Sequence, residues 1–290
     1  MSKNILITGG SGQLGATLFS DLKKTYNVIN TSRTGFLDSI KLDITNSNQV
    51  KIELEKYNPD IIINCASFND VDKCELKRKN ARDVIVQGLD NLIKSSKKKC
   101  KIVQISSDYV FDGSKEKYSE LDKPNPVNYY GRLKLEAENL LRSSNRDFII
   151  FRCSCVFSGL MSNKSNFLSW VYNNLKANNV IRVVRDQVSN PASVELISNV
   201  LNLAIVLNSK GIFNIGSLDS VSRFDFAVNV CDKFGFNKSL VKNIQTECLD
   251  QVAKRPKRTF LSIDKIINEL DIDVYSFDYY LNNIKKGHYE

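Results

Sequence analysis

The sequence predicts an α/β protein with a doubly wound parallel sheet. Short apolar runs rich in Ile and Val alternate with longer segments that have the periodicity of amphipathic helices. Strands that are buried on both faces and joined by crossover helices produce this alternation. A cluster of glycines also stands between the first apolar run and the first helical segment. We therefore expect a Rossmann sheet in the N-terminal half and a smaller α/β domain after it.

The elements of the N-terminal half follow from these runs in chain order. Each predicted strand is four or five residues long and mostly aliphatic, which suits a buried parallel sheet. The strands are Asn4–Thr8, Val28–Thr31, Ile61–Asn64, Ile102–Ser106 and Phe148–Arg152. The helices expected between them are Leu14–Lys24, Asn48–Tyr57, Ala81–Ser95 and Gly131–Ser143.

The alternation lapses after Arg152, where helical segments predominate. They are Asn166–Asn178, Val194–Leu207 and Arg223–Phe234, with a short strand at Ile212–Ile215 and a helical tail. We place a domain boundary at this point. Residues 1–152 are expected to form the first domain, and residues 153–290 mainly a second one.

The composition argues against several classes of protein. No run of about 18 apolar residues occurs, and the N-terminus lacks the regions of a signal peptide. The lack of such a run argues against a membrane protein, and the 41 Lys and Arg residues are interleaved with 32 Asp and Glu residues, which argues against nucleic-acid binding. Seven cysteines without a CxxC pair and a single histidine fit neither a disulfide framework nor a zinc site. We expect a cytoplasmic protein without a bound metal.

The first predicted strand leads into a turn with glycines three residues apart, at Gly9, Gly12 and Gly15. The first glycine allows the turn, the second lets a phosphate approach the backbone, and the third lets the helix pack on the strand. Backbone N–H groups at such a helix start bind phosphate groups. This turn, with Gln13 and Leu14, is expected to bind the pyrophosphate of a dinucleotide.

The end of the second strand indicates which dinucleotide is preferred. An acid there would bind the ribose 2′-hydroxyl, whereas this chain has Ser32 and Arg33. A guanidinium suits a 2′-phosphate, so we expect NADPH, with NADH as an alternative. The less favoured alternative is that Arg33 is a solvated loop residue. Asp43 and Ile44, which follow the next short apolar segment, are expected to reach the adenine.

Residues with catalytic chemistry follow the fourth strand. Ser107 and Asp108 stand at its end, and Tyr130 and Lys134 lie four residues apart at the start of a helix, on one face. A tyrosine titrates near about 10 and donates a proton poorly unless a cation stabilises its phenolate. We expect Lys134 to supply that charge, Tyr130 to donate the proton and Ser107 to hold the substrate oxygen.

Longer strings accompany these residues along nearly the whole chain. They are Gly12-Gln13-Leu14-Gly15, Val71-Asp72-Lys73, the segments 105–113 and 125–132, Asp186-Gln187, Gly211-Ile212-Phe213 and Arg255-Pro256. Together they resemble the extended short-chain dehydrogenase/reductase superfamily and its dTDP-4-dehydrorhamnose reductase branch. That branch includes similar UDP-rhamnose synthases of plants and giant viruses.

The resemblance implies roles for single residues. Ser107, Tyr130 and Lys134 occupy the family's catalytic positions, Asp108 and Tyr109 would line the sugar pocket, and Val71 its far wall. The string Asn64-Cys65-Ala66-Ser67-Phe68 replaces the family's usual Asn-Ala-Ala-Ala-His, so Cys65, Ala66 and Ser67 are expected along an altered nicotinamide pocket. Cys155 stands where the family usually has a tryptophan beside the substrate.

Later residues give weaker indications. Arg255 is a candidate clamp for the diphosphate of the substrate, since arginine binds phosphate bidentately, although a solvated loop is an equal alternative. Trp170 and the pair Tyr279-Tyr280 stand at apolar helical positions, which favours a place in the core over a role as ligand platforms.

The resemblance implies NADPH-dependent reduction of the C4 ketone of a nucleotide-linked 4-keto-6-deoxyhexose, giving dTDP- or UDP-L-rhamnose. One alternative is a bifunctional 3,5-epimerase and 4-reductase, with Cys65, Cys155 or Asp108 in the acid/base pair. Those bifunctional relatives tend to have cysteine in place of Asp108, and the two cysteines could simply pack. A second alternative is an NADP-binding regulatory subunit similar to methionine adenosyltransferase beta. The sequence is compatible with a homodimer but does not determine the oligomeric state.

Overall fold

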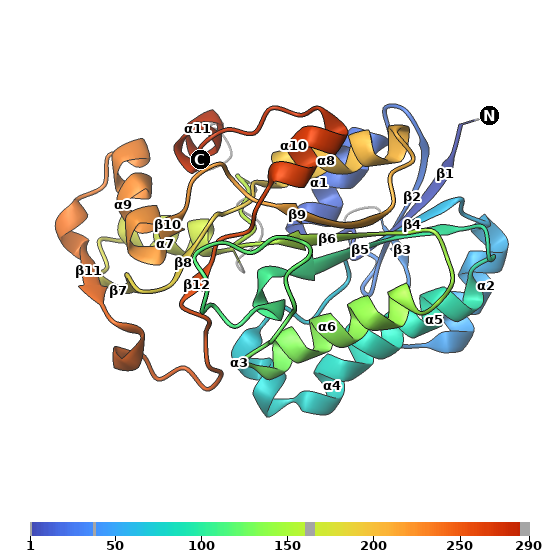
Figure 1. Ribbon diagram of the computed structural model, residues 1–290, viewed down its shortest axis with the longest axis horizontal. Helices are drawn as coiled ribbons and strands as arrows, with labels where there is room; N and C mark the ends of the chain where they lie inside the picture. Colours follow the sequence, from blue (N-terminus) through green and yellow to red (C-terminus); the bar gives the residue numbers. More distant parts are fainter. Residues whose placement is uncertain (1, 37–38, 160–165, 285–290) are drawn as a thin grey trace.

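A seven-stranded parallel sheet runs through the centre of the computed structural model, which describes residues 2–36, 39–159 and 166–284 (Figure 1). Its strand order is β3-β2-β1-β4-β5-β6-β9, so the direction in which strands are added reverses between β1 and β4. A doubly wound sheet binds its ligand outside the carboxyl ends of the strands at such a reversal. The strands are β1 (Asn4–Thr8), β2 (Asn27–Ser32), β3 (Ile40–Lys41), β4 (Ile61–Asn64), β5 (Lys101–Ser107), β6 (Phe148–Cys153) and β9 (Gly211–Ile215).

Both faces of the sheet are buried, as its aliphatic strands require. In β1, Ile5 and Ile7 pack on one face and Leu6 packs on the other, and all three are fully buried. The first face is covered by α1 (Gln13–Leu22), α8 (Val194–Val206) and α10 (Asp264–Leu270). The opposite face is covered by α2 (Ser47–Tyr57), α5 (Gly88–Ser95) and α6 (Tyr129–Arg142). The predicted Rossmann architecture is confirmed.

One predicted helix is built differently. In place of a single helix from Ala81 to Ser95, the chain forms α3 (Val71–Leu76), α4 (Arg78–Arg82) and a π-helical turn (Asp83–Gln87) that runs into α5. Gly88 follows this turn, and a Cβ atom there would lie 2.5 Å from the side chain of Ile44. The absence of a side chain at Gly88 lets α5 pack closely against Ile44, a contact that the hydrophobic periodicity of the sequence does not predict.

A second group of elements lies beyond one end of the sheet (Figure 1). It contains the parallel pair β7 (Ile181–Val184) and β11 (Val241–Ile244) and the three-stranded sheet of β8 (Val188–Ser189), β10 (Val221–Ser222) and β12 (Arg258–Thr259). Its helices α7 (Phe167–Lys176), α9 (Arg223–Phe234) and α11 (Phe277–Asn283) share an aromatic core around Phe157, Phe226 and Phe277.

The large sheet crosses the expected boundary at residue 152. β9 pairs with β6 along its whole length, and α8 and α10 complete the layer that covers one face. The C-terminal segment therefore contributes to both cores. Among the described residues, no helix is long and apolar enough to span a membrane.

Of the three aromatic residues predicted to lie in the core, one is partly buried and two are exposed. Tyr280 is partly buried against the core, but Trp170 is 41% exposed and Tyr279 45% exposed, so the prediction is wrong for these two. The buried face of α7 is formed by Leu168, Val171 and residues spaced with them, which leaves Trp170 outside it, stacked on Phe167.

Candidate active site

A cavity of about 320 Å³ opens where the carboxyl ends of β1, β4, β5 and β6 meet the second group of elements. From the predicted cofactor site it is lined by Gly9, Gly12, Gln13, Leu14, Gly15, Cys65 and Ser67. From the predicted catalytic and substrate sites it is lined by Val71, Ser107, Asp108, Tyr109, Tyr130, Lys134 and Cys155. The fold thus brings most predicted site residues to one place.

The glycine turn has the geometry that a phosphate site requires. Gly9 has a φ of +68°, and a Cβ atom there would lie 2.7 Å from the backbone nitrogen of Ala66. A Cβ atom at Gly15 would lie 2.4 Å from the carbonyl oxygen of Gly9. No side chain caps the start of α1 at Gly12, so the first N–H groups of this helix are available to an anion. The residues present therefore fit the pyrophosphate of a dinucleotide.

The end of β2 lies outside the lining of this cavity. The Ser32 hydroxyl is buried and forms a 2.6 Å hydrogen bond with the Ser39 hydroxyl, so it is already occupied. Arg33 follows it with an exposed side chain, and among the described residues no carboxylate forms an ion pair with it. Its guanidinium is therefore open to an anionic group such as a 2′-phosphate.

The expected adenine contacts have other partners in the structure. Asp43 Oδ1 accepts hydrogen bonds from the backbone N–H (3.0 Å) and the hydroxyl (2.8 Å) of Thr45. The Ile44 side chain is buried in the core, and its carbonyl oxygen accepts a 2.8 Å hydrogen bond from Asn91. Neither residue lines the cavity, and neither does Ala66, which packs against the glycine turn.

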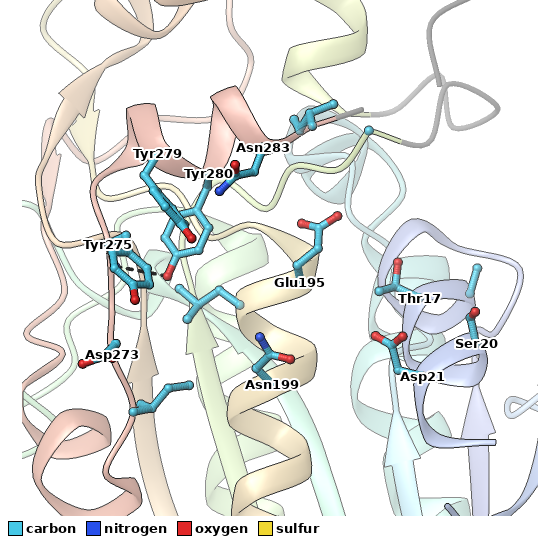
Figure 2. A pocket seen from close by; sticks show the side chains of 15 residues that line it. Thr17, Ser20, Asp21, Glu195, Asn199, Asp273, Tyr275, Tyr279, Tyr280 and Asn283 are labelled. Carbon is cyan, nitrogen blue, oxygen red and sulfur yellow. Dashed lines mark hydrogen bonds between the residues drawn. The ribbon is translucent and has the colours of Figure 1, made fainter. Parts of the chain in front are cut away.

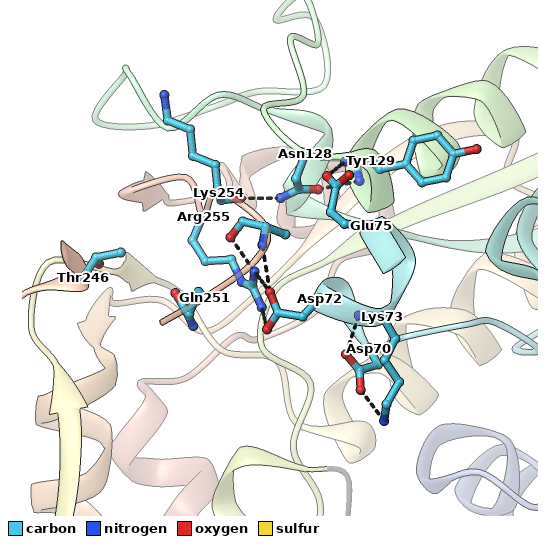
Figure 3. Close-up of polar contacts among 12 residues, drawn as sticks. Asp70, Asp72, Lys73, Glu75, Asn128, Tyr129, Thr246, Gln251, Lys254 and Arg255 are labelled. Carbon is cyan, nitrogen blue, oxygen red and sulfur yellow. Dashed lines mark hydrogen bonds and ion pairs between the residues drawn. The ribbon is translucent and has the colours of Figure 1, made fainter. Parts of the chain in front are cut away.

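The N-terminus of α6 carries the tyrosine and the lysine. Asn128 caps this helix by accepting a 2.8 Å hydrogen bond from the N–H of Gly131, and its amide donates to the carbonyl oxygen of Lys254 at 2.8 Å. The N–H of Tyr129 donates to Glu75 at 2.8 Å (Figure 3). The start of α6 is thus fixed from two directions, next to the end of β5 that carries Ser107.

Tyr130 and Lys134 form a pair inside the cavity. The Lys134 Nζ atom lies 5.5 Å from the centroid of the Tyr130 ring and donates to the carbonyl oxygen of Ile105 at 3.2 Å. Burial lowers the pKa of Lys134 to about 8. Burial also raises the pKa of Tyr130, against the opposing effect of a hydrogen bond with Ser107. The phenol therefore holds its proton at neutral pH until a reacting group withdraws it.

Asp108 is a buried anchor beside these residues. Its Oδ1 atom accepts a 3.0 Å hydrogen bond from Ser107, and its Oδ2 atom accepts from Ser154 at 3.0 Å and from Thr259. Burial raises the pKa of Asp108, although these hydrogen bonds oppose the rise. The carboxyl group thus ties β5 to β6 and β12 and orients the Ser107 hydroxyl.

Sequence reasoning missed Arg223, which lines the cavity from the start of α9. Its guanidinium donates to the thiol of Cys155 and lies 5.2 Å from the centroid of the Phe167 ring. Cys155 has a left-handed backbone, with φ of +39°. A cation in the first turn of a helix interacts unfavourably with the helix dipole. The position of Arg223 at the start of a predicted helix was therefore the signal in the sequence that could have identified it as a functional residue.

Arg255, the expected diphosphate clamp, does not line the cavity. Its guanidinium forms a bidentate ion pair with Asp72, at 2.7 and 2.9 Å, and also donates to the carbonyl oxygen of Ala253 at 2.6 Å (Figure 3). The Ala253 N–H donates to the same carboxylate at 2.9 Å. Because Asp72 already satisfies this cation, the structure gives Arg255 a place in holding the segment after Gln251 against α3.

A second, larger cavity of about 730 Å³ lies elsewhere, between α1, α8 and the C-terminal segment (Figure 2). It is lined by polar side chains of the two helices and by three tyrosines, Tyr275, Tyr279 and Tyr280. None of the predicted site residues lines it. The seven cysteines are free thiols, and the described residues contain no group of three side chains that could hold a metal ion.

Comparison with known proteins agrees with this geometry. The family model for the RmlD substrate binding domain matches residues 3–288. A dTDP-4-dehydrorhamnose reductase of Aggregatibacter actinomycetemcomitans is 33% identical over 97% of this chain and 98% of its own.

Solved structures give the same result. A dTDP-4-dehydrorhamnose reductase from Bacillus anthracis, crystallised in complex with NADP, superposes with a TM-score of 0.90 at 28% identity, over 98% of this chain and 99% of that one. A dTDP-4-dehydrorhamnose reductase from Clostridium acetobutylicum gives a TM-score of 0.88 at 33% identity, over 97% and 98% of the two chains.

Proposed function

The chain belongs to the RmlD substrate binding domain family, and from this premise we propose that it is an NADPH-dependent sugar-nucleotide reductase. The reaction is reduction of the C4 ketone of a nucleotide-linked 4-keto-6-deoxyhexose, giving dTDP- or UDP-L-rhamnose. The observation that carries the proposal is the meeting of Ser107, Tyr130 and Lys134 in one cavity beside the glycine turn. The relatives named above, which are reductases of this class, support it.

The two halves of the chain bind different ligands. Residues 1–152 hold the cofactor through the glycine turn, Arg33, Cys65 and Ser67, and they also carry the catalytic residues. Residues 153–290 mainly surround the sugar nucleotide. NADPH, when bound, supplies a hydride; NADH lacks the 2′-phosphate that Arg33 would bind.

The residues of the cavity then perform the proton chemistry. When the substrate binds, the Ser107 hydroxyl turns from Asp108 and donates its hydrogen bond to the ketone oxygen, which orients the carbonyl group. Tyr130 donates its proton to that oxygen as negative charge develops on it. The ammonium of Lys134, 5.5 Å from the ring, stabilises the phenolate that remains. Val71 and Tyr109 line the space for the sugar.

The thiols near the cavity support a dedicated reductase over a bifunctional epimerase. Burial raises the pKa of Cys65 to about 12, and it also raises the pKa of Cys155. Such thiols hold their protons at neutral pH and make poor general bases. Both oxygens of Asp108 accept hydrogen bonds from neighbouring side chains, so this carboxyl group serves better as an anchor than as a proton carrier.

The test is NADPH consumption by the purified protein with dTDP- or UDP-4-keto-6-deoxyglucose, each with and without a separate 3,5-epimerase. We expect turnover that depends on the epimerase and yields a rhamnose nucleotide. Turnover without the epimerase would instead establish the bifunctional enzyme. Absence of turnover under all conditions, with co-purification of a synthetase, would contradict the proposal in favour of a regulatory subunit.

A further inference from the structure

Arg223 gives the cavity a positive charge that the proton chemistry does not use. It is one of two cationic side chains among the described residues that line the cavity, and Lys134 is the other. Lys134 lies against Tyr130, whereas Arg223 reaches in from α9 and stands by Cys155 and Phe167. The two cations therefore serve different parts of the same space.

Most N–H donors of the Arg223 guanidinium have no acceptor among the described residues. The one hydrogen bond that its side chain forms within the described residues goes to the thiol of Cys155, and sulfur is a weak acceptor. The same part of the chain offers it no carboxylate at ion-pair distance. Asp108, the nearby acid, directs both oxygens to other side chains. A half-buried guanidinium with such partners is stabilised most by an anion that enters the cavity.

Two anions could enter, the pyrophosphate of the cofactor and the diphosphate of the sugar nucleotide. The cofactor group belongs at the start of α1, where the glycine turn offers free N–H groups. Arg223 instead contacts Cys155 and the ring of Phe167, on the side of the cavity assigned to the sugar nucleotide. Its surroundings favour the substrate group.

We propose that Arg223 binds the diphosphate of the sugar nucleotide, the task that the sequence suggested for Arg255. This inference rests on the proposed function and names the residue that recognises the charged part of its substrate. Arg255 is bound bidentately by Asp72 outside the cavity lining. The guanidinium of Arg223 lies beside the small side chain of Cys155 and over the ring of Phe167.

The test is calorimetric titration of the NADP⁺-loaded protein with dTDP, UDP and thymidine. Arg223→Gln should weaken dTDP and UDP binding by about tenfold to a hundredfold, because charge-assisted hydrogen bonds are lost. Arg223→Lys should recover part of the loss. Thymidine and NADP⁺ binding should stay within about twofold of the wild type, since neither requires this cation in the proposed arrangement.

The matched control is Arg185→Gln, which removes the same charge from an exposed site in the same half of the chain. It should bind every ligand as the wild type does. Unchanged dTDP binding by Arg223→Gln would overturn the inference, and so would an equal loss of NADP⁺ affinity. A wild-type protein that binds neither dTDP nor UDP would overturn it as well.

Binding through Arg223 without turnover of any keto-sugar would refute the reductase alone. The thermal unfolding curves of both variants show whether a loss of binding reflects a loss of folding. If Arg223→Gln is unfolded, the comparison of Arg223→Lys with the wild type decides, because a lysine cannot reproduce the bidentate fork.

Discussion

The two cavities described above differ in a way that their volumes do not reveal. The larger, of about 730 Å³, lies between helices and is lined by stacked tyrosines, with the rings of Tyr275 and Tyr279 4.1 Å apart. The smaller, of about 320 Å³, lies at the carboxyl ends of the strands and contains Tyr130 beside a buried lysine. The same residue type is a packing group in one cavity and the proposed proton donor in the other. Its neighbours decide its role.

Matched substitutions at one tyrosine of each cavity would test this contrast most strongly. Tyr130→Phe should lower kcat by about 10²–10⁴-fold, because it removes the proton donor while keeping the ring. Tyr279→Phe should leave kcat and KM unchanged, since this hydroxyl lies in the other cavity. Steady-state NADPH oxidation measures both. Equal effects of the two substitutions would remove the distinction between the cavities.

Lys134 should give the smaller cavity a characteristic pH dependence. Its pKa of about 8 means that the ammonium is present below this pH and is lost above it. The reduction rate should therefore fall as the pH rises through about 8. Lys134→Met should cost about 10²-fold in kcat and abolish this limb of the profile. A limb that persists in the variant would have to be assigned to another group.

A substitution at Arg33 tests whether the protein prefers NADPH to NADH. Arg33→Gln should raise the KM for NADPH by about tenfold and leave the KM for NADH unchanged, because only NADPH carries the 2′-phosphate. The ratio of kcat/KM values for the two cofactors is the readout. If both KM values change together, or if neither changes, Arg33 does not bind the 2′-phosphate.

The smallest effect is expected at the ion pair outside both cavities. Burial raises the pKa of Asp72, but hydrogen bonds from Arg255 and Ala253 lower it further, so the net pKa lies below its ordinary value. The pair therefore stabilises the fold above about pH 4, and this contribution disappears as the pH falls. Asp72→Asn should cost only about 1 kcal/mol, because Asp72 is 34% exposed and solvent screens the pair.

Urea unfolding at neutral and acidic pH measures this contribution, and the difference between the wild type and the variant should shrink in acid. The KM for the sugar nucleotide should stay constant in Asp72→Asn. A change in KM without a change in stability would restore Arg255 as a substrate ligand.

The elements that local sequence determines were predictable. The limits of β1 and β4 agree with the predicted strands, because a short aliphatic run before a turn has few alternatives. Tyr130 and Lys134 share the cavity as their helical spacing predicts. The Gly9 turn also follows from its residues, since its positive φ needs glycine.

Pairings between distant segments were not predictable in this way. Arg223 meets Cys155 across 68 residues, and Arg255 meets Asp72 across 183. Periodicity describes one element at a time and does not say which charge will find which partner. The boundary at residue 152 followed the lapse in alternation, but β9 and α8 return to the first sheet from beyond it.

The return of β9 to the sheet has a consequence for synthesis on the ribosome. Until residues 211–215 emerge, β6 is an edge strand with free backbone groups, and the side chains of Ile149 and Phe151 lack the layer formed by α8. The N-terminal half of the nascent chain therefore exposes an unpaired strand edge, which can pair with another chain, while some sixty further residues are translated. A fragment that stops at Arg152 would carry this edge permanently, so isolating the N-terminal half should yield aggregates rather than a small cofactor-binding module.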